Sequence, residues 1–112
     1  MTNHRDLNVL DAADQVADEV NQLIDSAPRR LIHVMQLRES AQSIGANISE
    51  GFGRGGVGER RSALRIARGE AEETIRHLRA NFESKRIPRA TFWRLKNRLI
   101  TIVKMLTSLM KR

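Results

Sequence analysis

Arginine is the residue type in this chain whose number and spacing best suit chemistry with a ligand. Guanidinium forks bind phosphate in a bidentate manner, and a row of them over about 30 Å matches the footprint of a nucleic-acid backbone. One narrow sector of an expected helix, interrupted by Glu72, contains Arg61, Arg65, Arg68, Arg76 and Arg79. The array continues into the flanking turns, where it ends near Arg89. The residues predicted to bind nucleic acid, RNA or DNA, are therefore Arg54, Arg60, Arg61, Arg65, Arg76, Arg79, Lys85 and Arg86.

The distribution of charge along the chain leaves a second interpretation open. The 112 residues include 20 Lys and Arg against 13 Asp and Glu, a net charge of +7. Residues 1–26 hold one basic and six acidic side chains, so they carry −5 and the remainder carries +12. The arginines could thus form a solvated face balanced by the acidic segment, within one subunit or between subunits. Aromatic residues make up only 4% of the chain, which does not favour recognition of single strands by base stacking.

Other motifs that could carry chemistry lack the context that they need. Residues 51–56 spell G-x-G-x-x-G, but a helix is expected before them, whereas dinucleotide binding requires a strand. Residues 53–58 have P-loop spacing, yet Glu59 follows where a lysine must reach the phosphates. The three histidines are scattered, and no serine has a recognisable His and Asp arrangement. We therefore expect no enzyme, no catalytic residue, no metal site and no cofactor.

Several polar residues lie beside apolar positions of two consecutive helices. Ser43, Asn47 and Glu50 share one side of the first, and Arg68 and Glu73 flank the apolar stripe of the next. Antiparallel packing would bring these groups together. Because charges next to apolar stripes are normally paired, we interpret them as a structural polar network. A ligand-binding site is the alternative.

Apolar residues recur at three- and four-residue steps in four segments of the chain. The expected helices cover residues 7–25, 29–50, 59–84 and 88–110. The clearest stripe, in the fourth segment, consists of Phe92, Leu95, Leu99, Ile102, Leu106 and Leu109. Short connections favour antiparallel neighbours, so residues 1–112 are predicted to form one all-α domain, an up-down-up-down four-helix bundle.

Residues typical of helix ends and turns flank the second segment on both sides and sharpen its expected boundaries. Ser26 and Pro28 are suited to the start of the second helix. Five glycines within residues 51–58 predict a turn there, with the helix ending at Gly51 and a left-handed C-cap.

The fourth segment has more apolar residues than one seam requires. Trp93, Ile100, Val103 and Met110 lie beside its stripe, and such a face predicts an oligomer interface and hence a homo-oligomer. No sorting signal and no sufficiently long apolar stretch is visible, so we expect a cytoplasmic protein without a membrane partner.

Two stretches of the chain resemble a known family. They are Ser43-Ile-Gly-Ala-Asn-Ile-Ser-Glu-Gly-Phe-Gly-Arg54 and Leu64-Arg-Ile-Ala-Arg-Gly-Glu-Ala-Glu-Glu73. Over residues 31–109 the chain is similar to the four-helix bundle proteins encoded within intervening sequences of bacterial 23S ribosomal RNA genes. These are related in fold to the accessory variability determinant of diversity-generating retroelements, which assists a reverse transcriptase.

The resemblance implies an antiparallel four-helix bundle, a ring of five subunits, no known catalysis and a basic surface that binds nucleic acid. Matching motif positions are Asn47, Glu50, Gly51, Arg54, Arg68 and Glu73. The chain departs from the family at Gly45, where proline is usual, and at Glu70, where serine is usual. The expected function is a non-enzymatic, oligomeric bundle that binds nucleic acid, as an accessory to a ribonucleoprotein or reverse transcriptase. A structural scaffold whose basic face meets the acidic first helix or another protein is the alternative.

Overall fold

Four helices account for nearly all of the chain in the computed structural model, which describes residues 4–27 and 29–111. They are α1 (His4–Ser26), α2 (Val34–Gly53), α3 (Val57–Glu83) and α4 (Arg89–Met110), and the described residues contain no strand. The bundle measures 45 × 22 × 18 Å. The all-α four-helix bundle predicted from the apolar periodicity is confirmed, with α1, α3 and α4 within a few residues of their expected bounds.

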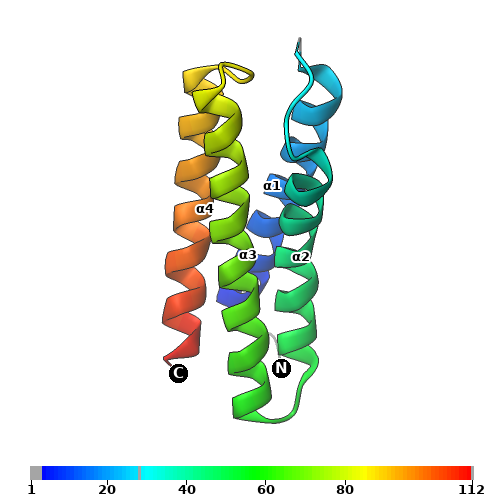
Figure 1. Cartoon of the computed structure of the whole chain (residues 1–112). Helices are drawn as coiled ribbons and strands as arrows, with labels where there is room; N and C mark the ends of the chain where they lie inside the picture. The colour runs from blue at the N-terminus through cyan, green and yellow to red at the C-terminus, as the bar shows by residue number, and fades with distance from the viewer. Residues whose placement is uncertain (1–3, 28, 112) are drawn as a thin grey trace.

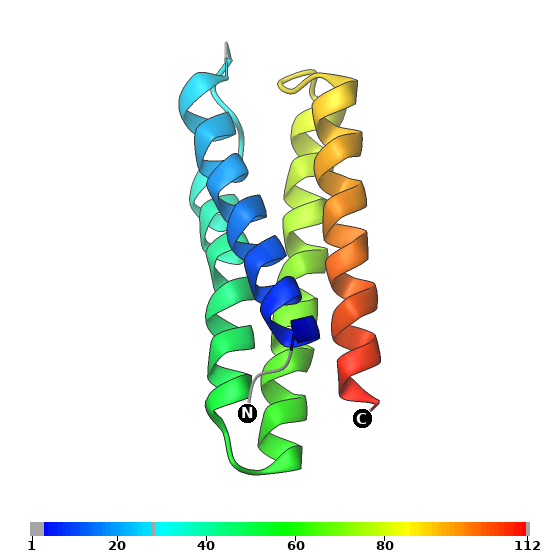
Figure 2. The same ribbon diagram turned by 180° about the vertical axis from the view of Figure 1, so that it is seen from behind.

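The helices alternate in direction along the bundle, as Figure 1 shows. Among the described residues, α1 packs against α2 and α4, α3 packs against the same two helices, and the backbones of the diagonal pairs stay apart. α1 runs obliquely across the side of the bundle opposite α3 (Figure 2). The acidic first helix therefore lies diagonally opposite the helix that carries most of the predicted nucleic-acid residues.

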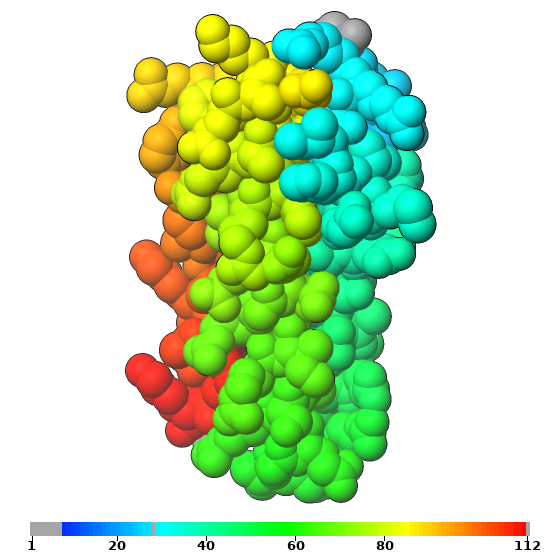
Figure 3. Space-filling model, viewed as in Figure 1, coloured from blue at the N-terminus to red at the C-terminus, as the bar shows by residue number. Residues whose placement is uncertain are grey.

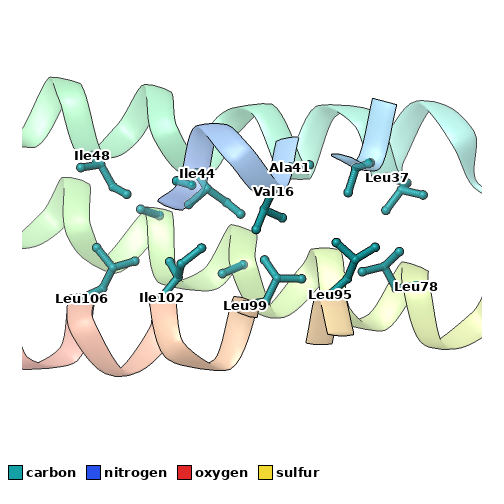
Figure 4. Packing of buried hydrophobic residues seen from close by; sticks show 14 of the residues in the cluster. Val16, Leu37, Ala41, Ile44, Ile48, Leu78, Leu95, Leu99, Ile102 and Leu106 are labelled. Carbon is teal, nitrogen blue, oxygen red and sulfur yellow. The ribbon is translucent and has the colours of Figure 1, made fainter. Parts of the chain in front are cut away.

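The core is a continuous cluster of aliphatic side chains along the bundle axis (Figure 4). The entire predicted stripe of α4, from Phe92 to Leu109, is buried. In the described part of α1 the buried apolar positions are Val9, Ala13, Val16 and Val20, whereas Leu10 and Ala17 are only partly buried. The 3-4 spacing of the four buried residues defines the side of α1 that faces the core.

The second helix begins at Val34 rather than near residue 29, and Asn81 provides the physical reason. The Asn81 Oδ1 accepts a hydrogen bond of 2.7 Å from the Ile32 N–H, and its Nδ2 donates to the Ile32 carbonyl at 3.1 Å. These bonds satisfy backbone groups of Ile32 outside a helix, and His33 then adopts a left-handed conformation with φ 56°. Ser26 ends α1 instead of capping α2, and Pro28 lies outside the described residues.

The glycine-rich turn is shorter than predicted, because α2 continues to Gly53 and α3 starts at Val57. Gly51 is helical and buried, and a Cβ atom there would lie 3.1 Å from the Ala63 Cβ. No described glycine has a positive φ, and α2 is followed by Arg54 in an extended conformation. The expected left-handed C-cap is therefore wrong: Gly51 permits close packing of α2 on α3 rather than a reversal of the chain.

Candidate nucleic-acid interface

Four arginines follow the side of α3 that faces α4, and we call Arg61, Arg65, Arg68 and Arg79 the arginine face. The Arg61 Nε donates to the Met110 carbonyl at 3.0 Å, and the Arg68 Nη1 donates to the Thr107 Oγ1 at 3.2 Å. The Arg79 guanidinium lies 5.8 Å from the centre of the Phe92 ring. Arg65 is exposed in the same sector of the helix. Figure 3 shows this region, where side chains of α4 project beside those of α3.

The arginine face keeps its charge unneutralised. Among the side chains that the structure describes, none of its four arginines forms an ion pair. The sector from Arg61 to Arg79 spans about 27 Å at 1.5 Å per residue. Glu72 and Glu83 lie in the same sector and are exposed, so the face is cationic but not uniformly so.

Two other arginines of the predicted array are paired with carboxylates. Arg54 contacts Glu50 and, at 3.4 Å, Glu59. Arg76 contacts Glu73. The hydrogen bond that Arg54 donates to Glu50 raises the pKa of Arg54, and the hydrogen bond that Glu73 accepts from Arg76 lowers the pKa of Glu73. Because carboxylates neutralise part of their charge, Arg54 and Arg76 contribute less positive electrostatic potential at the surface than two unpaired arginines would.

The remaining predicted cations lie near the ends of α3. Arg60 is partly buried, with its guanidinium 5.2 Å from the centre of the Phe52 ring. Lys85 is exposed in a left-handed conformation with φ 61°. Arg86 connects the two loops at this end, since its Nε donates to the Arg30 carbonyl at 3.0 Å. Arg86 therefore has a structural role besides its charge.

The structure does not bring the five predicted network residues together. The Asn47 Nδ2 donates to the Ser43 carbonyl of its own helix at 2.8 Å, and Glu50 contacts Arg54 in the turn. Arg68 points toward α4, and Glu73 contacts Arg76 and, at 2.9 Å, His77. The single network is therefore wrong, because Arg68 and Glu73 lie on different sides of α3.

A shallow groove at the glycine turn contains part of the family motif. Its volume is about 490 Å³, and its lining residues are Asn47, Glu50, Arg54, Gly58, Glu59, Ser62, Ala63 and Ile66. Arg68 and Glu73 do not line it, so the cavity that an active site around those residues would need is not formed there.

The buried polar residues that do connect helices escaped sequence reasoning. The Thr74 hydroxyl lies 2.9 Å from the Ser40 Oγ of α2 and also donates to the Glu70 carbonyl. Thr74 and Asn81 are fully buried. Both continue the 3-4 spacing of Leu64, Ala67, Ala71 and Leu78, and this periodic signal could have identified them.

One acidic residue of α1, Glu19, pairs with arginines of α4 and not with the arginine face. Glu19 contacts Arg98 and, at 2.5 Å, the Nη1 of Arg94, and the Gln15 Oε1 accepts a bond of 2.8 Å from Arg98. Neither arginine was among the predicted nucleic-acid residues. Within one subunit, the acidic helix leaves the arginine face uncovered.

Gly45, where the chain departs from the family pattern, lies beside Asp14 of α1. A Cβ atom on Gly45 would meet the Asp14 carboxylate, an exposed group that a rotation of the side chain could move, so this contact alone does not require glycine. Desolvation raises the pKa of Asp14, and the charges of Asp18 and Asp11 act in the same direction.

The residues predicted for an oligomer interface differ in exposure. Trp93 is 40% exposed, whereas Ile100 is partly buried. Val103 and Met110 are also partly buried and pack against the core cluster. Much of the apolar surface attributed to an interface thus already packs within the subunit.

The fold and its open cationic face define a small, basic four-helix bundle protein. The family model for the 23S rRNA-intervening sequence protein matches residues 5–108, and the chain belongs to that family. A solved structure of a protein of unknown function from the S23 ribosomal protein family of Bacteroides thetaiotaomicron VPI-5482 is similar, with a TM-score of 0.89 at 26% identity. The alignment covers 96% of this chain and 99% of that one. No curated protein matches the chain.

No helix among the described residues is long and apolar enough to span a membrane.

Proposed function

We propose that this protein is a non-enzymatic, homo-oligomeric bundle that binds RNA or DNA through the arginine face. The observation that carries the proposal is the row of four arginines without carboxylate partners along about 27 Å of α3. Phosphates that bind such a row release condensed counterions, so affinity falls steeply with salt. Family membership is consistent with a nucleic-acid partner, and the implied accessory role would add a ribonucleoprotein or reverse transcriptase.

Two triple variants with the same change in net charge test the proposal. The first, Arg61→Ala, Arg65→Ala and Arg79→Ala, removes unpaired cations from the arginine face. The matched control, Arg38→Ala, Arg94→Ala and Arg98→Ala, removes three arginines that bond to Asn21 or Glu19 on the α1 side. Fluorescence anisotropy with a labelled oligonucleotide at several salt concentrations measures both affinity and its salt dependence.

The first variant is expected to lose affinity by about tenfold or more, and its log-log salt slope becomes shallower by up to about three. The control variant retains most of its binding. Equal losses in the two variants, or a salt slope near zero for the unmodified protein, would overturn the proposal.

A protein scaffold is the second candidate, and the acidic residues of α1 favour it. Asp11, Asp14 and Asp18 are exposed on one side of α1, and none forms an ion pair among the described side chains. They could meet the arginine face of a second copy. Such a head-to-tail contact between different surfaces generates a closed ring, which includes the five-membered ring implied by the family, or a filament.

If the protein is a scaffold, the molecular mass of its assembly should depend on the salt concentration. Light scattering at low and high salt should show dissociation as salt increases, and Asp11→Asn with Asp14→Asn and Asp18→Asn should lower the mass at low salt. An assembly whose mass changes neither with salt nor with these substitutions rules out this contact.

A further inference from the structure

We infer that the arginine face takes unpaired nucleotides, with the indole of Trp93 as the surface on which a base stacks. This inference rests on the proposed function and names its substrate class. Trp93 is the only tryptophan of the chain and is 40% exposed near the start of α4. Its neighbour Phe92 lies edge-to-face against it, with ring centres 5.8 Å apart. Because the Arg79 guanidinium lies 5.8 Å from the centre of the same Phe92 ring, the indole is linked to the arginine face through Phe92.

Two cations flank this aromatic surface. The Lys96 Nζ is 4.3 Å from the centre of the Trp93 ring and 5.9 Å from that of Phe92. Neither Lys96 nor Arg79 forms an ion pair among the described side chains. A nucleotide combines an aromatic base with a phosphate, so its two parts match the indole and the adjacent cations. Phe82 stacks on Phe92 with ring centres 4.8 Å apart and supports the platform from α3.

The requirement for an unpaired base follows from the geometry of nucleic acids. Bases inside a duplex are stacked on one another and cannot lie on a side chain, whereas single strands and loops present them freely. The low aromatic content of the chain predicted little stacking, but a single base needs only one indole. The structure supplies that indole beside unpaired cations.

A second copy of the chain fits this site less well. Trp93 is the one large hydrophobic side chain of α4 that is exposed in the described structure, and Val103 and Met110 already pack against the core. A stable protein interface buries about 1,200 to 2,000 Å² in total, with an apolar centre. One partly exposed indole with Lys96 over its ring provides little of that apolar area.

Intrinsic fluorescence tests the inference directly, because Trp93 is the sole tryptophan of the chain. A 12-residue uridine or thymidine oligonucleotide should quench the emission in a saturable manner. A duplex of the same length should quench it little and bind at least about tenfold more weakly. Trp93→Ala should weaken binding of the single strand by about five- to 100-fold, and Trp93→Phe by less, since a phenyl ring still stacks.

Met35→Ala is the matched control, because Met35 is 70% exposed and belongs to α2 rather than to the arginine face. It should leave the affinity for the single strand unchanged. Labelled oligonucleotides supply the affinities for variants without tryptophan, and circular dichroism checks that each variant is folded.

The possible failures are distinguishable. Equal affinity for single strand and duplex, with no effect of Trp93→Ala, overturns this inference and leaves the proposed function standing. No binding of either nucleic acid overturns both. If Trp93→Ala lowers the mass of the assembly and oligonucleotides leave the fluorescence unchanged, the indole belongs to an interface between copies and the inference is wrong.

Discussion

The two long sides of α3 use polar groups in opposite ways. The side toward α2 buries Thr74 and Asn81, and both hydrogen-bond to groups of neighbouring segments. The side toward α4 carries the arginine face, where guanidinium groups reach over the edge of the seam and keep access to solvent. The first side contains satisfied neutral groups without access to water, whereas the second contains charges without carboxylate partners.

This difference indicates which residues specify the fold and which are available for a ligand. A buried polar group costs stability when its partner is removed, because it has no access to water. An exposed cation without a carboxylate partner contributes little to stability, and its field is free to act on a phosphate. Substitutions on the α2 side should therefore affect unfolding, and those on the α4 side should mainly affect binding.

Replacement of Asn81 should have the largest effect on stability. Asn81→Ala leaves the N–H and carbonyl of Ile32 without their partner, so we expect a loss of about 3 kcal/mol in the free energy of unfolding. Urea unfolding followed by circular dichroism, at one fixed protein concentration, measures this. Asn97→Ala on the exposed surface of α4 is the control and should cost far less. A loss below about 1 kcal/mol for Asn81→Ala would contradict the role of this residue.

Replacement of Thr74 should have an intermediate effect. Thr74→Val preserves the shape but removes the bonds to Ser40 and to the Glu70 carbonyl, and we expect a loss of about 1 kcal/mol. Thr101→Val is a close control, since the Thr101 hydroxyl bonds in the same way to the carbonyl four residues earlier but is exposed. Similar unfolding midpoints for the two variants would show that the hydrogen bond between Thr74 of α3 and Ser40 of α2 adds no stability.

Replacement of Arg79 should affect stability less and binding more. Arg79→Ala removes the contact with Phe92, which is worth about 0.5 kcal/mol at a partly exposed site. Its affinity for an oligonucleotide should fall clearly in the same preparation. A loss of stability comparable to that of Asn81→Ala, with binding retained, would reverse the distinction between the two sides of α3.

The smallest effect concerns the pH dependence contributed by Glu73. Arg76 and His77 lower the pKa of Glu73 in the folded protein, so its stabilising contribution is present at neutral pH and is lost as pH falls through the folded pKa. Glu73→Gln should lower the melting temperature slightly at pH 7 and not at pH 2.

Glu72→Gln, which removes an exposed carboxylate that bonds to none of the described side chains, is the control for this titration. Glu73→Gln also frees Arg76 and should raise oligonucleotide affinity modestly. An equal change in the melting temperature of Glu73→Gln at both pH values would show that the pH dependence of stability does not come from Glu73.

Much of the fold was predictable because local periodicity and the need to bury apolar surface agree in this chain. The stripe of α4 is entirely buried, as its spacing requires. The start of α2 was not predictable, since it depends on Asn81, 49 positions away in the sequence from Ile32. Gly51 could not be distinguished from a helix-ending glycine without the position of Ala63 across the seam.

The candidate site was predictable as a set of residues but not as a surface. Helical spacing placed Arg61, Arg65, Arg68 and Arg79 in one sector, and the structure keeps them there. The i,i+3 spacing of Glu73 and Arg76 is that of neighbours on a helix, but spacing could not show that Glu19 pairs with Arg94 across 75 residues. The supposed polar network failed for the same reason, because side chains close in sequence can face different neighbours.

By itself, the sequence determined four amphipathic helices, a net charge of +7 and its division between an acidic first helix and a basic remainder. These properties depend on composition and on the 3.6-residue period, which act locally along the chain. Only the tertiary structure decided that α1 lies diagonally opposite α3, so that Glu19 pairs with Arg94 and Arg98 of α4 and the arginine face keeps no carboxylate partner among the described side chains. Charge pairing depends on distance in space, and that distance is fixed by which helices share a seam.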